Sequence, residues 1–283
     1  MQLDENILTC VGFLGCNRKS GPVLGGTVFF LGYPMTDELM AMYAVTARHV
    51  IEDIGKRSDD GSVLLRLNGR DGALLSHPVP REAWIFHDDP SIDVAVAPLD
   101  GDLLSTIDHK LMHLSSLATS ETLAQGQIGI GEELFFPGLF KHRHGDTKNL
   151  PIIRVGNIAA MPSEDIETSW GRVRAPYLIE ARSIGGLSGS PVIVEVGAIR
   201  VKRGNKPLTL APGAYLLGLI HGHYGCEEKV WDAVDVAETD DARRNSVNMG
   251  VAIVVPADQI KEVLELPALR ALRDLMVAAE NAG

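Results

Sequence analysis

The sequence predicts an all-β protein with two six-stranded antiparallel β-barrels and a C-terminal helix. Twelve short runs of apolar and β-branched residues, each bounded by turn residues, follow one another up to residue 256. Twelve short strands suit two barrels of six strands each. Beyond residue 256 the apolar residues change to helical spacing. The chain has 283 residues, 45% of them hydrophobic, and is long enough to fill both barrels as one unit.

The first six strands are expected in a barrel at about residues 7–100. They are the runs 7–14, 25–32, 41–46, 62–67, 83–87 and 93–98. A short helical turn, HVIEDIGK, follows the third run. Residues 101–130 have a mixed pattern, and we interpret them as the connection between the barrels.

The second barrel is expected at about residues 131–256, so that residues 1–256 form one domain. Its strands are the runs 133–137, 151–159, 176–181, 191–196, 214–221 and 248–254. Residues 257–283 form a separate helical segment with Pro267 inside it. Because proline has no N–H to donate, we expect Pro267 to divide this segment into two helices.

The acidic composition argues against two classes of partner. The net charge is −11 and the isoelectric point is about 5.3, which does not favour binding to nucleic acid or to anionic membranes. No stretch approaches the ~18 apolar residues of a membrane span. The start of the chain, MQLDENILTC, is acidic where a signal peptide is basic. We therefore expect neither nucleic-acid nor membrane partners.

The sequence has three cysteines, Cys10, Cys16 and Cys226. Three is too few for a disulfide framework, and an odd number cannot all pair within the chain. Cys10 and Cys16 could pair, although free thiols in a reducing compartment are the simpler interpretation. Without a signal peptide, this predicts a cytoplasmic location.

Three segments carry a histidine, an aspartate and a serine in the pattern of a nucleophilic site. TARHV contains His49, SIDVAVAPL contains Asp93 and GGLSGSPVI contains Ser188. Acyl transfer needs a nucleophile, a base that takes its proton and a carboxylate that orients the base. Gly186 and Gly189 flank the serine and allow the tight bend that brings backbone N–H groups close to a substrate carbonyl.

Some residues compete for these roles. Ser190 is the neighbouring alternative to Ser188 as nucleophile. The carboxylates Asp88, Asp89 and Asp100 lie near Asp93 in sequence, but only Asp93 begins an apolar run that would bury it beside the core. His49 is one of nine histidines, and its TARHV context singles it out.

These motifs resemble those of the trypsin-like, chymotrypsin-fold serine peptidases, nearest in pattern to the HtrA-like and glutamyl-endopeptidase-like bacterial members. The family's T-A-x-H, D-[IVL]-A-[VL] and G-x-S-G-[GS]-P patterns match residues 46–49, 93–96 and 186–191, and the resemblance extends over about residues 25–266. It implies a chymotrypsin-like double barrel that hydrolyses peptide bonds through an acyl-enzyme on Ser188. His49 would be general base and acid, Asp93 would orient it, and the N–H groups of Gly186 and Ser188 would form the oxyanion hole.

One departure from the digestive enzymes affects activation. Leu187 precedes the serine where those enzymes have an aspartate that captures a newly cleaved N-terminus. Activation by N-terminal clipping is therefore not expected. The resemblance implies protein or peptide substrates and no cofactor. Because the sequence lacks a signal peptide and this activation switch, we expect a selective intracellular effector protease, with an activating protein partner.

The resemblance also places the S1 pocket, in the residues just before the serine and in the strand after it. These residues are Arg182, Ser183, Ile184, His221, Gly222 and His223. The pair of Ser183 and His221 resembles the glutamyl endopeptidases, and donors from these residues could hold an acidic P1 side chain. The alternative is a small apolar pocket.

Other functions are open to the same sequence. The barrel could be an inactive protease-like scaffold that binds a protein partner. An esterase or other acyl hydrolase would use the same chemistry, although the order His–Asp–Ser differs from the Ser–Asp–His order of α/β-hydrolases. A metal site is not expected, because the candidate ligands lack the spacing of a zinc motif; these are His142, His144, His221, His223 and Cys226.

Overall fold

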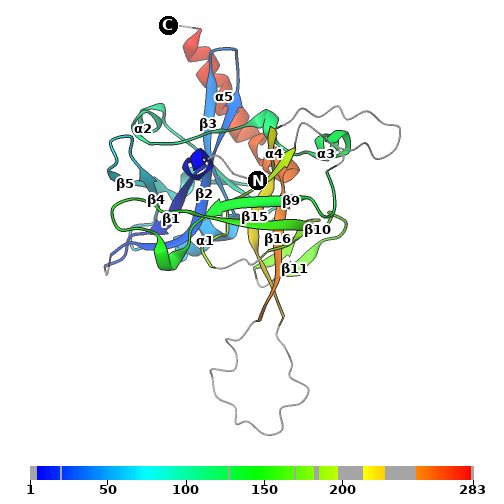
Figure 1. Ribbon diagram of the computed structural model, residues 1–283. Helices are drawn as coiled ribbons and strands as arrows, with labels where there is room; N and C mark the ends of the chain where they lie inside the picture. The colour runs from blue at the N-terminus through cyan, green and yellow to red at the C-terminus, as the bar shows by residue number, and fades with distance from the viewer. Residues whose placement is uncertain are drawn as a thin grey trace.

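The computed structural model describes residues 5–19, 21–126, 128–168, 170–181, 185–196, 213–226 and 247–281. These residues form two large β-sheets, one from each half of the chain, and a separate two-stranded sheet, with two helices at the C-terminal end (Figure 1). The all-β class with a helical C-terminus is confirmed. In this part of the chain no helix has both the length and the apolar character needed to cross a membrane.

The N-terminal sheet is curled and open, in the strand order β5-β4-β1-β2-β3-β7-β6, with β8 pairing in parallel with β2. Its strands are β1 (Val11–Cys16), β2 (Val23–Pro34), β3 (Met40–Thr46), β4 (Ser62–Asn68), β5 (Leu74–Pro80), β6 (Ile85–Phe86), β7 (Ala95–Pro98) and β8 (Met112–His113). The expected run 7–14 is instead a 3-10 helix, η1 (Glu5–Cys10), followed by β1. Helix α1 (Arg48–Arg57) follows β3, at the predicted helical turn.

We expected the first sheet to close into a barrel, but it is open, with β5 and β6 as its two edge strands. β5 was not predicted, because Pro78 and Pro80 within it disfavour a strand in the sequence pattern. Proline cannot donate to a ladder, so such a segment is confined to an edge, and β5 lies at one end of the sheet. The opposite edge, β6, has only two residues. The connection after β7 contains helices α2 (Gly101–Thr106) and α3 (Ser120–Gly126).

The C-terminal sheet is a closed six-stranded barrel in the order β10-β13-β16-β15-β14-β9, as predicted. Its strands are β9 (Glu133–Gly138), β10 (Ile152–Ala160), β13 (Tyr177–Glu180), β14 (Pro191–Val196), β15 (Gly213–Cys226) and β16 (Val247–Pro256). A short hairpin, β11 (Ile166–Thr168) and β12 (Gly171–Val173), lies between two of the predicted runs, where the sequence predicts no strand. Three-residue strands are too short to produce a recognisable alternation.

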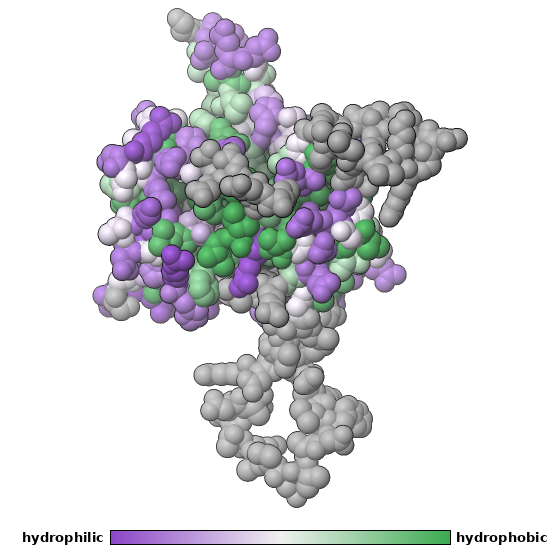
Figure 2. All heavy atoms as spheres, in the orientation of Figure 1, coloured by the Kyte–Doolittle hydropathy of each residue, from purple (hydrophilic) through white to green (hydrophobic). Residues whose placement is uncertain are grey.

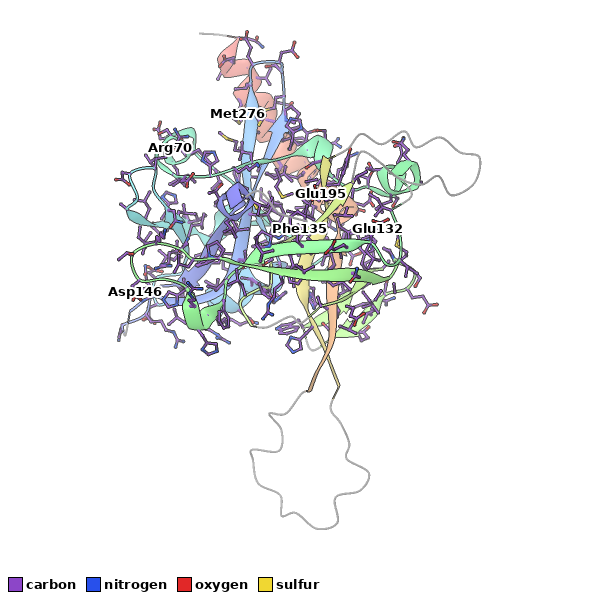
Figure 3. The ribbon with its side chains drawn as sticks, in the orientation of Figure 1. Arg70, Glu132, Phe135, Asp146, Glu195 and Met276 are labelled. Atoms are coloured by element: carbon purple, nitrogen blue, oxygen red, sulfur yellow. The ribbon has the colours of Figure 1, made fainter. Side chains whose placement is uncertain are left out.

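The two sheets share a continuous core. Phe135 of β9 (labelled in Figure 3) and Ile193 of β14 belong to the C-terminal barrel, but they pack in the same apolar cluster as the N-terminal sheet. A second cluster fills the interior of the C-terminal barrel. Figure 2 shows hydrophobic side chains over β9 and β10 among hydrophilic ones; Val155 of β10 is 56% exposed there.

The last helix of the described residues packs on the N-terminal sheet. Helices α4 (Ala257–Leu264) and α5 (Pro267–Glu280) are separate, with Pro267 in the first turn of α5, which confirms the predicted division. Arg273 of α5 is buried, and its guanidinium donates to the Tyr43 hydroxyl at 3.1 Å and to the Leu264 carbonyl at 2.8 Å. It also lies 4.0 Å from the ring centroid of Tyr33 and pairs with Glu265 at 3.5 Å.

We expect Arg273→Ala to lower the free energy of unfolding by about 3 kcal/mol, because it leaves buried partners without their cation. Arg270→Ala is the matched control on the same helix: Arg270 pairs with the same Glu265 but is 60% exposed, so its loss should cost less than about 1 kcal/mol. Urea unfolding of both variants measures the difference. Equal losses would contradict this account of the helix contact.

Candidate active site

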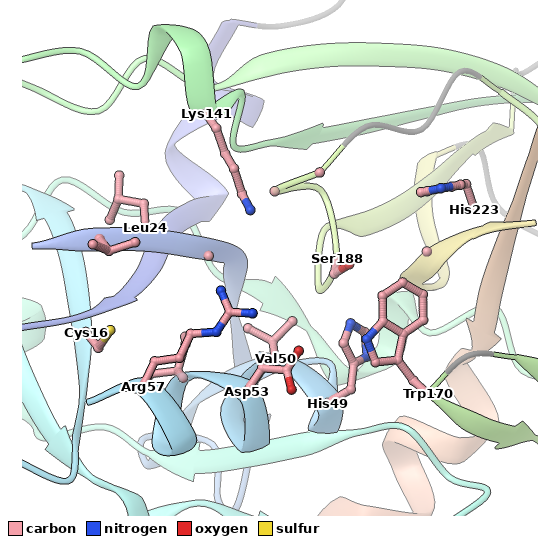
Figure 4. A pocket seen from close by; sticks show the side chains of 16 residues that line it. Cys16, Leu24, His49, Val50, Asp53, Arg57, Lys141, Trp170, Ser188 and His223 are labelled. Carbon is pink, nitrogen blue, oxygen red and sulfur yellow. The ribbon is translucent and has the colours of Figure 1, made fainter. Parts of the chain in front are cut away.

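The three predicted catalytic side chains come from both sheets. His49 lies in the first turn of α1, directly after β3, and Asp93 lies two residues before β7. Ser188 lies in the turn between β13 and β14 of the other sheet. His49 and Ser188 line one pocket of about 270 Å³ (Figure 4). The fold therefore brings to one place residues that are far apart in sequence.

His49 and Asp93 are joined by two hydrogen bonds. The His49 backbone N–H donates to Asp93 Oδ1 at 2.9 Å, and His49 Nδ1 lies 2.8 Å from Asp93 Oδ2. Both side chains are buried. Burial lowers the pKa of His49, but the charge and hydrogen bond of Asp93 outweigh it, so the pKa is raised above 6.5. Burial alone would raise the pKa of Asp93, yet the two histidines beside it hold that pKa well below its usual range.

The structure distinguishes the two candidate nucleophiles. Ser188 is partly exposed and lines the pocket, whereas Ser190 is fully buried and does not. Ser190 Oγ lies against Gly138, at 2.0 Å from where a Cβ would be. Within the described residues no hydrogen bond joins the Ser188 hydroxyl to His49. Such contacts are often loose before substrate binds.

The serine turn is held by contacts with the N-terminal sheet. The Thr27 hydroxyl donates to the Gly186 carbonyl at 2.8 Å, and the Thr27 N–H donates to the Ser188 carbonyl at 2.9 Å. Gly189 has φ of +85°, and a Cβ there would lie 2.1 Å from Thr46 Oγ1. Only glycine combines this conformation with so close an approach.

The predicted oxyanion donors are available. The N–H groups of Gly186 and Ser188 donate to no other residue in the described part of the chain. Both residues line the pocket that contains His49. Leu187, between them, is buried in the core of the C-terminal barrel, so its apolar side chain fixes the turn to that barrel. This arrangement can receive a carbonyl oxygen that becomes negatively charged.

The predicted specificity residues divide into three groups. Arg182, Ser183 and Ile184 lie outside the described residues. Gly222 and His223 line the pocket. The placement of His221 in that pocket is corrected: its ring is buried, Nδ1 bonds Asp93 Oδ2, and Nε2 lies 3.2 Å from Thr168 Oγ1. With both nitrogens engaged, His221 cannot donate to an acidic P1 side chain.

Sequence reasoning missed Trp170, which covers His49. The two ring centroids are 5.1 Å apart with the planes tilted by 32°, and Trp170 also meets His221 edge-on at 5.6 Å. The indole is 46% exposed and lines the pocket. A single tryptophan in the polar stretch EDIETSWGR was the available signal, since an exposed aromatic residue in a loop is unusual.

The cluster of His49, Asp93 and His221 brings metal-ligand types within 4.8 Å of one another. Both histidine Nδ1 atoms face the same oxygen, Asp93 Oδ2, so hydrogen bonds account for the cluster.

Cys10 and Cys16 are free and buried, and burial raises the pKa of the Cys10 thiol to about 12, which makes it unreactive.

No protein-family model matches the chain, and no curated protein matches it in sequence. Solved structures do. The apo MamO protease domain from Magnetospirillum magneticum is 13% identical, covers 93% of this chain and 100% of its own, and has a TM-score of 0.54. Human heparin binding protein is 10% identical, covers 94% and 96%, and has a TM-score of 0.50. The chain has the trypsin-like serine protease fold. At these identities the likeness establishes the fold alone.

We expect Thr27→Val to destabilise the trypsin-like fold by about 2 kcal/mol. The valine leaves the Gly186 carbonyl and the Leu139 N–H, which donates to Thr27 Oγ1 at 2.9 Å, without a buried partner. Thr27→Ser keeps the hydroxyl and should lose only about 1 kcal/mol, for one methyl group. Thermal and urea unfolding measure both. A valine variant as stable as the serine variant would contradict the assigned role of this hydroxyl.

Proposed function

We propose that the chain is a serine endopeptidase that hydrolyses peptide bonds of protein or peptide substrates. One observation carries the proposal: Asp93 binds both the ring and the backbone N–H of His49. That ring shares a pocket with Ser188 and with two N–H groups that donate to no other described residue. A nucleophile, a base, an orienting carboxylate and oxyanion donors are thus assembled in one place.

The mechanism follows from which ring nitrogen of His49 is free to accept a proton. Asp93 accepts the Nδ1 proton of His49, so His49 Nε2 is the nitrogen that can take the proton of Ser188 Oγ. Oγ then bonds to the scissile carbonyl carbon, and the N–H groups of Gly186 and Ser188 stabilise the oxyanion. His49 returns the proton to the leaving amine, which breaks the C–N bond. Water, activated by the same histidine, releases the acyl group and restores Ser188.

The rival proposal is an inactive scaffold that keeps the fold to bind a protein partner. A fluorophosphonate probe distinguishes the two, because it reacts only with an activated serine.

We also propose a cytoplasmic location, which is supported by the free thiols of Cys10 and Cys16.

We expect Ser188→Ala to abolish peptide hydrolysis and fluorophosphonate labelling without loss of the fold. Ser190→Ala is the matched control two residues away; its hydroxyl is buried, so labelling should persist. Mass spectrometry of the labelled peptide identifies the modified serine. Labelling that survives in Ser188→Ala, or that is lost only in Ser190→Ala, would assign the nucleophile elsewhere. No labelling of the folded wild type would favour the scaffold.

The rate of labelling should rise with pH. Only neutral His49 can accept the Ser188 proton, and its raised pKa places the midpoint above 6.5. Asp93→Asn removes the charge that raises this pKa, so the midpoint should fall, and the rate should drop by about 10⁴-fold. Labelling rates between pH 5 and 9, with circular dichroism to monitor folding, test both. A wild-type midpoint at or below 6.5 would contradict the assignment.

We propose that preferred substrates have an acidic side chain after the scissile bond, on the leaving-group side. Lys141 and Arg57 line the pocket, and in the described part of the chain neither cation has an ion pair. Asp53, the pocket carboxylate, already pairs with Lys56 at 3.5 Å. Figure 4 shows both cations on the side of Ser188 away from His223. Since the resemblance assigns the strand of His223 to the acyl side, the cations face the residues after the scissile bond.

We expect peptides with Glu at the first or second position after the scissile bond to be cleaved faster than their Gln counterparts. Removal of each cation, in Lys141→Met and Arg57→Met, should reduce this preference about fivefold, as for one exposed charge pair. Arg143→Met is the control, because Arg143 lies near Lys141 but does not line the pocket. Values of kcat/KM for the peptide pairs are the measurement. A preference for Glu at P1 instead would restore the acidic S1 pocket.

A further inference from the structure

The imidazole of His49 is covered by the indole of Trp170. The two ring centroids are 5.1 Å apart and the planes are tilted by only 32°, so the rings lie closer to face-to-face stacking than to an edge contact. With this cover His49 is only 8% exposed, although it lines a pocket. Figure 4 shows the two side chains together on one side of Ser188. The proposed mechanism uses His49 and leaves Trp170 without a role.

Contacts with the backbone fix the position of the indole. The Trp170 N–H donates to Thr168 Oγ1 at 3.2 Å, at the end of β11. Gly222 of β15 has no side chain, and Trp170 Cζ3 lies 3.2 Å from where its Cβ would be. The indole therefore packs against bare backbone of the barrel. Directly after β12, the Arg174 N–H donates to the carbonyl of Ser91 in the loop before β7, so the hairpin that carries the indole is also tied to the other sheet.

An aromatic face distinguishes between the two protonation states of the ring that it covers. Its π-electrons give the face a partial negative charge, which attracts a cation and acts far less on a neutral ring. His49 becomes a cation, the imidazolium, when it accepts a proton. Burial lowers the pKa of His49, and the carboxylate of Asp93 raises it above 6.5. The stacked indole acts in the same direction as that carboxylate, from the face of the ring rather than from its Nδ1 edge.

We propose that Trp170 is a positioning residue whose indole face stabilises the imidazolium that His49 becomes when it takes the proton of Ser188. The inference rests on the proposed function for this kinetic step. Its effect on the protonation of His49 can be measured in a chain that hydrolyses nothing.

Other charged and titratable groups also face His49, and they come from α1, the Asp93 loop, the 3-10 helix after β9, and β15. These groups are Glu52, Asp53, Arg57, Asp93, Lys141, His221 and His223. All of them stay in place when only Trp170 is replaced. A change in the protonation of His49 in such a variant therefore reports on the indole.

Two possible roles of Trp170 predict opposite changes. If the indole were only an apolar cover, a smaller side chain would admit water to His49, favour the imidazolium and raise the pKa. If the aromatic face stabilises the imidazolium, Trp170→Leu should lower the pKa, because leucine is an apolar cover without a π-face. Trp170→Phe keeps an aromatic face and should give an intermediate value.

Proton NMR titration of His49 makes this measurement without a substrate. Its resonance is assigned by its loss in His49→Gln, and His77 on the edge strand β5 is the control, whose titration should be the same in every variant. We expect the acid dissociation constant of His49 to increase about fivefold in Trp170→Leu and about twofold in Trp170→Phe. An unchanged or smaller constant in Trp170→Leu would overturn the inference, whether or not the chain is an active peptidase.

Fluorophosphonate labelling rates between pH 5 and 9 give the kinetic test, with circular dichroism to monitor folding. We expect Trp170→Leu to lower the plateau rate about fivefold and to move the midpoint to lower pH, with partial recovery of both in Trp170→Phe. A lower plateau with the wild-type midpoint would indicate a merely structural role and overturn the inference. No labelling of the folded wild type would refute the proposed function instead, and the NMR titration would still decide whether the indole stabilises the imidazolium.

Discussion

A single buried threonine joins the two sheets at the point where the site is built. Thr27 lies on β2 of the N-terminal sheet and uses its hydroxyl and its backbone N–H to hold the turn that carries Ser188. Its carbonyl accepts from Thr46 Oγ1 at 2.7 Å, and Thr46 lies three residues before His49. One short network therefore sets the position of Ser188 relative to His49. Gly189 makes this network possible, because any side chain there would separate the sheets.

Much of the fold and of the site could be predicted from local sequence. The motifs around His49, Asp93 and Ser188 are short, and each contains the residues that give it its shape, such as the glycine with positive φ beside the serine. The closed barrel could be predicted because its strands are long apolar runs. The open edge of the first sheet could not, since prolines made β5 look like a loop.

The contacts that sequence reasoning missed are those made across the fold. His221 was predicted to face the substrate, yet it bonds Asp93, which lies 128 positions earlier in the chain. No local pattern records which side of β15 will meet the other sheet. Trp170 is similar: its hairpin is too short to be predicted, and its position over His49 depends on Thr168 and on the loop near Ser91.

The return of the chain to the first sheet has a consequence for folding during synthesis. Leu269 and Arg273 complete the core and the polar contacts of a sheet whose strands begin at Val11. A nascent chain that has extended only as far as the C-terminal barrel still lacks this cover. The N-terminal sheet, which supplies His49 and Asp93, can reach its full stability only after α5 has left the ribosome. The fold thus delays completion of the candidate active site until residues 267–280 have been synthesised and have emerged from the ribosome.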